Sequence, residues 1–354
     1  MKQFWLAALL LLFTLGAGRS NADNQKLRII SWADYVPADL IAAFKKETGI
    51  DVEVTLSNNE EIISKLRATG GAGYDLAQPS QDRITAAQRE FGIYKPIDLA
   101  KVKLDEFQPA FLDIVRKNST LDGKQYALPY LWGTDGLVVN AKRTKVADYT
   151  DLCRADLKGK TAVRLKRPTL MAFAFASGKD PFALYGDPKA YGALMDQVGA
   201  ALIACKPTFK FFYDNKDQLL NGIRSGEVIA AMMWDTGGWT LSRDNPDIQF
   251  VVPRSGALGW LDTFALPARG RNDAAAYSWI NFTMRPENAA RVIKSVGSFS
   301  AANGTAGLID PRLKAQFAAA FPNNDLKSIH WYPAIPPGLE EMEGKVLDRV
   351  KAAN

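Results

Sequence analysis

Short apolar segments alternate with amphipathic ones along most of the chain, and this alternation constrains the fold more than any other feature. Residues 27–37 begin with an Ile-rich run typical of a buried strand. A segment with helical spacing follows, with Pro37 at its start and Gly49 at its stop. The same order of strand and helix occurs twice more before residue 93. Strands that alternate with helices predict a parallel sheet with helices on both faces.

A second series of this kind follows further along the chain. Its predicted strands lie at 158–165, 208–213, 228–234 and 248–253, with helical segments between them. Two α/β series of similar size predict two lobes, each a mostly parallel sheet flanked by helices. No Ser/Gly-rich linker divides them. The segments "YLWGTDGLVVN" and "GWLDTFALP" at the boundaries are apolar and strand-like, so we expect strand crossings that act as a hinge.

These crossings define the expected domains. We assign residues 23–134 plus 263–300 to the first lobe, and residues 135–262 plus 301–354 to the second.

The first 22 residues have the pattern of a secretory signal peptide. Lys2 gives a positive start, Phe4–Gly16 is almost wholly apolar, and Ser20 and Ala22 are small residues at the spacing of a cleavage site. The apolar part is shorter than the ~20 residues that cross a bilayer. No cysteine lies near the cut, so no lipid attachment is expected. The sequence predicts a soluble, exported protein.

Export determines the interpretation of the two cysteines, Cys153 and Cys205. An oxidising compartment favours a disulfide between them. The alternative is a pair of buried free thiols, because sequence does not give the geometry that a bridge requires.

Composition excludes several classes of function. Removing Lys2 and Arg19 with the signal leaves 42 of the 44 basic residues against 38 acidic ones, a net charge of +4. This small value, without a basic tract, does not favour nucleic-acid binding. The one histidine, His330, lies in a Pro-rich loop, which excludes a histidine-rich zinc site and makes a Ser-His-Asp triad improbable. We expect no metal and no cofactor.

Four tryptophans are expected at strand ends, two of them in the predicted crossings: Trp32, Trp132, Trp234 and Trp260. Ligands of open α/β sheets bind at the carboxyl ends of strands, so these residues favour an aromatic-walled cleft over core packing. Three of them have an acid close behind, namely Asp34, Asp235 and Asp262. Aromatic faces attract ammonium groups and carboxylates pair with them. Asp235 is equally suited to capping a helix, whereas the place of Asp262 in a crossing favours ligand contact.

The segments "IISWADYVPADLIAAFKKETGIDV", "YDLAQPS", "ALPYLWGTDGLVVN", "VIAAMMW" and "GWLDTFALP" resemble those of periplasmic spermidine/putrescine-type solute-binding proteins of ABC importers. The resemblance covers nearly the whole mature chain and implies the type II periplasmic-binding-protein fold, in which two lobes close over an elongated amine. It implies that Trp32, Asp34, Tyr35 and Ser80 line the first lobe and that Trp234 stacks on the ligand. Trp260 and Asp262 would lie at the hinge, with Asp262 binding an amino group. We add Gln81 and Asp235 to the ligand-binding candidates.

The segment "TAVRLKRPTL" departs from this family. Val163 and Leu165 alternate with Arg164 and Lys166, which predicts a strand, and a third cation, Arg167, follows. The resemblance implies acidic residues at this place, where Lys166 and Thr169 stand. A cation there repels an ammonium group and attracts a carboxylate.

The carboxylates and tryptophans suit an amine, and these cations suit an anion. The simplest ligand that satisfies both is a zwitterion, such as γ-aminobutyrate, δ-aminovalerate, or an acylated or carboxylated polyamine. The alternatives are a plain polyamine, a different anion, or three basic residues that only face solvent.

The sequence therefore predicts a monomeric binding protein that closes over its ligand, does no chemistry on it, and docks on a membrane ABC permease. Two rivals are a receptor that presents the ligand to a sensor protein, and a secreted enzyme acting on amines with Asp34, Asp235 or Asp262 as its base.

Overall fold

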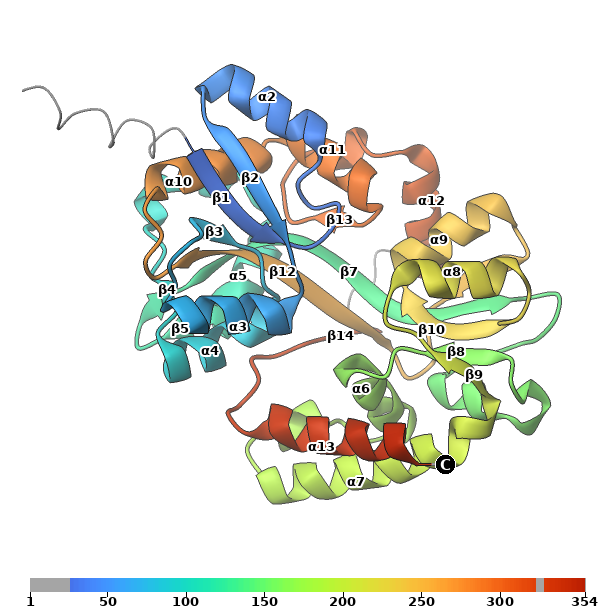
Figure 1. Ribbon diagram of the computed structural model, residues 1–354. Helices are drawn as coiled ribbons and strands as arrows, with labels where there is room; N and C mark the ends of the chain where they lie inside the picture. Colours follow the sequence, from blue (N-terminus) through green and yellow to red (C-terminus); the bar gives the residue numbers. More distant parts are fainter. Residues whose placement is uncertain (1–25, 323–327, 354) are drawn as a thin grey trace, which may run out of the picture.

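The computed structural model describes residues 26–322 and 328–353, so the predicted signal peptide lies outside the described residues. One mixed sheet runs through the molecule (Figure 1). Two parallel groups of strands form its ends, and two long antiparallel strands join them in the middle. In spatial order, the strands are β2 (Asp51–Leu56), β1 (Lys26–Ser31), β3 (Leu76–Ala77), β12 (Ala257–Pro267), β7 (Ala127–Asn140), β10 (Ala230–Trp234), β8 (Thr161–Val163) and β9 (Phe209–Phe212).

Shorter strands extend this sheet at its centre. β11 (Ile248–Val251) and β13 (Phe299–Ser300) pair with β7, and β4 (Tyr94–Lys95) and β14 (Ile329–Trp331) pair with β12. A separate hairpin consists of β5 (Thr120–Leu121) and β6 (Lys124–Gln125).

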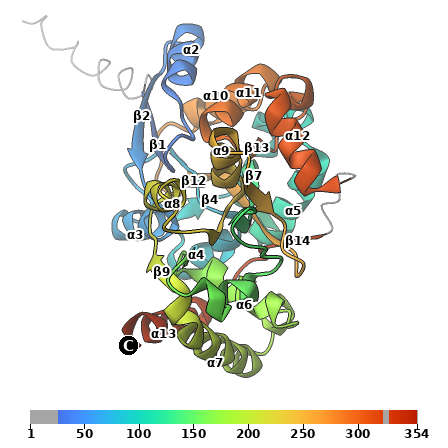
Figure 2. The ribbon, with the colours of Figure 1, turned by 90° about the vertical axis from the view of Figure 1, so that its right-hand side faces the viewer.

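Helices surround both ends of the sheet, as Figures 1 and 2 show. Around β1–β3 lie α2 (Ala38–Thr48), α3 (Asn59–Thr69), α4 (Ile84–Phe91), α5 (Pro109–Ser119), α10 (Asp273–Thr283), α11 (Pro286–Val296) and α12 (Pro311–Ala320). Around β8–β10 lie α6 (Arg167–Ala176), α7 (Pro188–Cys205), α8 (Lys216–Arg224), α9 (Asp235–Asp244) and α13 (Leu339–Ala352). We call these two halves the first and the second lobe; the predicted two-lobed α/β architecture with strand crossings is confirmed.

Each lobe has its own apolar core. The first core contains buried residues between Leu27 and Trp132 and between Leu261 and Leu313, together with Trp239. The second contains buried residues between Leu137 and Val350. Trp260 packs against both cores. The predicted lobe boundaries stay a prediction, although residues 301–313, which we expected in the second lobe, contribute Ala301, Ala302 and Leu313 to the first core.

The prediction of a strand through Lys166 is wrong. β8 ends at Val163, and α6 begins at Arg167. Pro168 explains the change, because proline cannot donate to a strand ladder but suits the first turn of a helix. The three cations therefore do not alternate between the faces of a sheet. The surroundings of each one are set by the turn and the helix start in which it lies.

The predicted disulfide is confirmed. Cys153 and Cys205 are bonded, with S–S 2.02 Å and Cα–Cα 4.7 Å. The bridge ties the short helix Tyr149–Cys153 to the end of α7, within the second lobe.

Candidate functional site

Asp262 is the buried carboxylate at the centre of the candidate site. Its side chain is 4 % exposed. Ser80 Oγ donates to Asp262 Oδ1 at 2.5 Å, and the Tyr35 hydroxyl donates to Oδ2. Thr263 N donates to the Pro79 carbonyl oxygen at 2.9 Å, which fixes Ser80 beside β12. Three predicted residues, separated by up to 227 positions in sequence, thus meet at one carboxylate.

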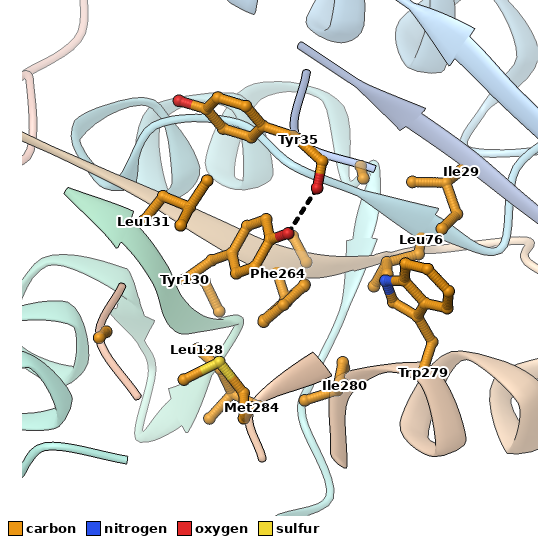
Figure 3. Packing of buried hydrophobic residues seen from close by; sticks show 14 of the residues in the cluster. Ile29, Tyr35, Leu76, Leu128, Tyr130, Leu131, Phe264, Trp279, Ile280 and Met284 are labelled. Carbon is orange, nitrogen blue, oxygen red and sulfur yellow. Dashed lines mark hydrogen bonds between the residues drawn. The ribbon is translucent and has the colours of Figure 1, made fainter. Parts of the chain in front are cut away.

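Tyr35 is held in place by the first core. The Tyr130 hydroxyl donates to the Tyr35 carbonyl oxygen at 2.6 Å, and both residues are buried (Figure 3). Trp32 follows β1 directly and its Nε1 donates to the Gln78 carbonyl oxygen at 3.0 Å, with its ring 6.5 Å from that of Tyr35. Asp34, between them, is exposed and has a left-handed backbone with φ 68°. The segment is a tight turn that brings Trp32 and Tyr35 to the same place and leaves Asp34 in solvent.

One face of the crossing strands carries the central residues. Trp234 on β10 lies opposite Asp135 on β7, and Asp135 lies opposite Leu258 on β12. Opposed residues and residues two apart in a strand project to the same face, so Trp234, Asp135, Trp260 and Asp262 share it. Asp262 is four residues beyond Leu258, or about 13 Å along the strand at ~3.3 Å per residue. Two buried carboxyls, those of Asp135 and Asp262, therefore lie well apart on this face.

Trp260 lies over Gly133 in the middle of this face. A side chain at Gly133 would bring its Cβ within 2.4 Å of the Trp260 ring. Trp132, by contrast, is buried between Phe111 and Phe299, at ring distances of 5.0 and 4.8 Å. The expectation that all four tryptophans stand at strand ends is wrong: Trp132 and Trp260 lie inside long strands, and Trp132 fills the first core.

Arg164 occupies the second-lobe end of this face. Its guanidinium lies 5.0 Å from the centroid of the Trp234 ring. Burial raises the pKa of the nearby Asp135, and the charge of Arg164 offsets part of that rise. Arg164 Nε is buried and has no hydrogen-bond partner in the described part of the chain. A desolvated donor without an acceptor is costly, so this nitrogen is suited to receive an acceptor from a ligand.

The other two cations of "RLKR" have different surroundings. Lys166 is exposed. Arg167 is 6 % exposed, and its guanidinium donates to Glu343 Oε1 at 2.7 Å, lies 3.8 Å from Asp82 Oδ2 and contacts the Tyr185 hydroxyl. The charge of Arg167 is thus already balanced by protein carboxylates.

Three more candidates form internal bonds. Asp235 is 0 % exposed; its Oδ2 accepts from Thr134 N at 2.8 Å and Thr134 Oγ1 at 3.0 Å, and its Oδ1 accepts from Thr236 N at 2.6 Å. Gln81 donates to the Tyr332 carbonyl oxygen at 3.0 Å. Thr169 donates to the Arg164 carbonyl oxygen at 2.5 Å, which fixes the turn that carries Arg164. Ligand contact by these residues stays a prediction.

Sequence reasoning missed several neighbours of the site. Asp135, Asp82, Tyr332 and Glu343 are buried there, and none stood out in its local pattern. Asp135 lies in the quoted crossing "YLWGTDGLVVN", where its opposition to Trp234 could be found only from the strand register.

Burial raises the pKa of Asp135, Asp235 and Asp262 to about 7. An aspartate in an unfolded chain has a pKa of ~3.9. Between about pH 4 and pH 7, these three carboxyls therefore bind more protons in the folded protein than in the unfolded chain. Their contribution to the free energy of unfolding accordingly falls as the pH rises through this window.

The change Asp135→Asn is expected to flatten this pH dependence by up to about 1.4 kcal/mol per pH unit, because it removes one titrating group. Urea unfolding of the ligand-free protein across the window measures the slope. Asp348→Asn, at an exposed position on α13, is the control and should leave the slope unchanged. Equal slopes for both variants would refute the titration of Asp135.

No group of histidine, cysteine and carboxylate side chains among the described residues is arranged to hold a metal ion. None of their helices is both long and apolar enough to cross a membrane.

Comparisons with known proteins give consistent results. Residues 39–319 match the family model described as bacterial extracellular solute-binding protein. The putrescine-binding periplasmic protein of Escherichia coli is 27 % identical over 99 % of both chains, and the spermidine/putrescine-binding periplasmic protein of the same organism is 30 % identical over 83 % of both. A solved spermidine/putrescine ABC transporter substrate-binding protein from Streptococcus pneumoniae superposes with a TM-score of 0.75 at 24 % identity, covering 92 % of this chain and 98 % of that one. The expected type II periplasmic-binding-protein fold is confirmed.

Proposed function

The chain belongs to the bacterial extracellular solute-binding proteins, and from this membership we propose that it is the periplasmic substrate-binding subunit of an ABC importer for a small zwitterion. The ligand class is an ω-amino acid, such as γ-aminobutyrate or δ-aminovalerate, or a polyamine that carries a carboxylate or acyl group. Relatives that bind putrescine and spermidine support the amine half of this proposal.

Asp262 is the group that receives the ammonium end. It is buried, it accepts hydrogen bonds from Ser80 and Tyr35, and the indole of Trp260 shares its face of the sheet. A carboxylate beside aromatic rings in a desolvated place binds an ammonium group by charge and by the ring quadrupole. The deprotonated form of Asp262 binds the cation, so ligand entry favours loss of its proton.

The position of Arg164 is the observation that most supports a zwitterionic ligand. Its guanidinium already lies over Trp234 and beside Asp135, so a cation of the protein occupies the place that a second ammonium group of a diamine would need. Its unpartnered Nε can donate to a ligand carboxylate. Lys166 is exposed and Arg167 is paired with Glu343, so Arg164 is the member of the three cations best placed for this role.

Asp135 favours a second candidate, an unmodified polyamine. A buried carboxyl opposite Trp234 could receive a second ammonium group if Arg164 turned away from the indole. The names of the relatives also favour this candidate. It requires the burial of a second cation next to Arg164, and like charges a few ångströms apart repel by several kcal/mol at an effective dielectric of ~20.

The two lobes capture the ligand by closing over it. The ligand contacts Asp262, which is bonded to Ser80 and Tyr35 of the first lobe, and Arg164 of the second lobe. It therefore stabilises the closed arrangement by its higher affinity for that arrangement. The closed protein then docks as a soluble monomer on a membrane permease. The relatives are solute-binding proteins, so we assign no reaction to Asp34, Asp235 or Asp262.

Isothermal titration with γ-aminobutyrate, δ-aminovalerate, putrescine and spermidine tests the proposal. We expect the highest affinity for an ω-amino acid. Arg164→Met should weaken that binding by about 30-fold or more, since truncating one partner of a buried charge pair costs ~2–5 kcal/mol. The same change should leave putrescine binding unchanged or improve it.

Lys166→Met is the matched control, two residues away and exposed, and should change no affinity by more than about twofold. Tight putrescine or spermidine binding with no ω-amino acid binding would replace the zwitterion by a polyamine. Chemical change of any recovered ligand would show an enzyme instead.

A further inference from the structure

A cavity lies between α9, α11 and α12. It is separate from the interlobe face, by which we mean the strand face that carries Trp234, Asp135, Trp260 and Asp262. The volume of the cavity is about 320 Å³, and we call it the α9–α11–α12 cavity. Trp239, Ile293 and Leu313 are the buried apolar side chains of its wall. Leu308, at its edge, is 54 % exposed, one of five large apolar side chains exposed in the described residues. The hollow therefore presents apolar surface to solvent at the junction of three helices.

Two polar side chains of the wall are already engaged. Gln316 Nε2 donates to the Trp239 carbonyl oxygen at 3.2 Å, and Thr240 Oγ1 donates to the Thr236 carbonyl oxygen at 2.8 Å. An apolar wall with few free polar groups is a poor place for ordered water, which needs two to four partners. An occupant must therefore bring an apolar body.

The edge of the cavity is positive. Arg243 and Lys294 are exposed lining residues, and no ion pair of Lys294 occurs among the described side chains. The acid at the edge, Asp310, accepts from Arg312 N at 2.8 Å and from Arg312 Nη2 at 3.4 Å, so its charge is partly balanced. The net charge around the opening suits an anion.

We propose that the α9–α11–α12 cavity binds a compact amphipathic anion, an aromatic or branched aliphatic carboxylate or sulfonate. The apolar body lies against Trp239, Ile293 and Leu313 and covers Leu308. The anionic group lies at the opening between Arg243 and Lys294. The volume is within the range of pockets for small molecules. The site shares no residue with the interlobe face and does not depend on the proposed transport ligand.

The probe for this site is 8-anilinonaphthalene-1-sulfonate, which combines an aromatic body with an anionic group and fluoresces when desolvated. Added to the folded mature protein, it should show saturable binding to one site. Ala290→Phe, which fills the cavity from α11, should weaken binding at least tenfold. Lys294→Glu should weaken it about three- to tenfold. Indole-3-acetate should displace the probe, and indole, which lacks the charge, should displace it less well.

Two control variants carry the same changes outside the cavity. Ala274→Phe lies at an exposed position of α10, and Lys314→Glu lies at an exposed position of α12 that does not line the cavity. Both should bind the probe like the parent protein. If Ala290→Phe fails to fold, as judged by thermal unfolding, the probe affinities of Lys294→Glu and Lys314→Glu can still be compared to test the proposal. Absence of saturable binding, or equal binding by Lys294→Glu and Lys314→Glu, would overturn the proposal.

Discussion

Replacing Asp262 with asparagine is expected to lower the affinity for an amine-containing ligand by about 30- to 4,000-fold, the equivalent of ~2–5 kcal/mol. The change removes the negative charge that the ammonium group would contact. The side-chain amide still fits between Ser80 and Tyr35, because both hydroxyls can accept as well as donate hydrogen bonds. The loss should therefore appear in binding and not in folding.

Isothermal titration with the best ligand of the four compounds measures this loss, and thermal unfolding of the ligand-free variant checks the fold. Asp348→Asn, exposed on α13, is the control and should bind like the parent protein. An affinity unchanged by Asp262→Asn would remove this residue from the ligand site. It would also contradict the proposal that the site binds an ammonium group, whatever group the ligand carries at its other end.

Replacing Glu343 with glutamine is expected to cost about 3–5 kcal/mol of unfolding free energy, because it leaves a buried charge on Arg167 without its main partner. Glu343 is 3 % exposed; its Oε1 accepts from Arg167 Nη1 at 2.7 Å and also from the Tyr191 hydroxyl. Asp82, at 3.8 Å, is too distant to replace it fully. Urea unfolding at neutral pH measures the cost.

The double variant Arg167→Met with Glu343→Met should recover most of this stability, since apolar residues often replace a buried ion pair at little cost. Glu341→Gln, on the solvent face of the same helix, is the control and should leave stability unchanged. If Glu343→Gln is as stable as the control, Arg167 does not depend on Glu343 and its guanidinium is available to a ligand.

The elements could be predicted because their signals are local. Pro37 and Gly49 bound α2 as expected, and Gly49 has the left-handed φ of 73° that ends a helix. The long crossings at β7 and β12 were visible as apolar runs without a linker. The prediction of a strand through Lys166 failed because Pro168 outweighs the alternation of "VRLK". A helix that packs on the second core begins at Arg167 instead.

The residues around Asp262 were found for a different reason. Tyr35, Ser80 and Asp262 each follow or lie in a strand that the sequence marks, and the resemblance assigned them a common role. Asp135 and Glu343 carry no such mark. Their importance depends on which residue lies opposite, and that is a property of register and of helix packing.

By itself, the sequence determined the alternating α/β elements and the two lobes, because propensity and apolar spacing act between neighbours. It favoured the disulfide only through the expected export, and it pointed to Asp262 only through the family resemblance. Only the tertiary structure decided the surroundings of each cation of "RLKR". Lys166 is exposed to solvent, a partner 176 positions away on α13 balances the charge of Arg167, and the guanidinium of Arg164 lies over the indole of Trp234. The physical reason is that desolvation and charge pairing are set by residues distant in sequence, which no local pattern encodes.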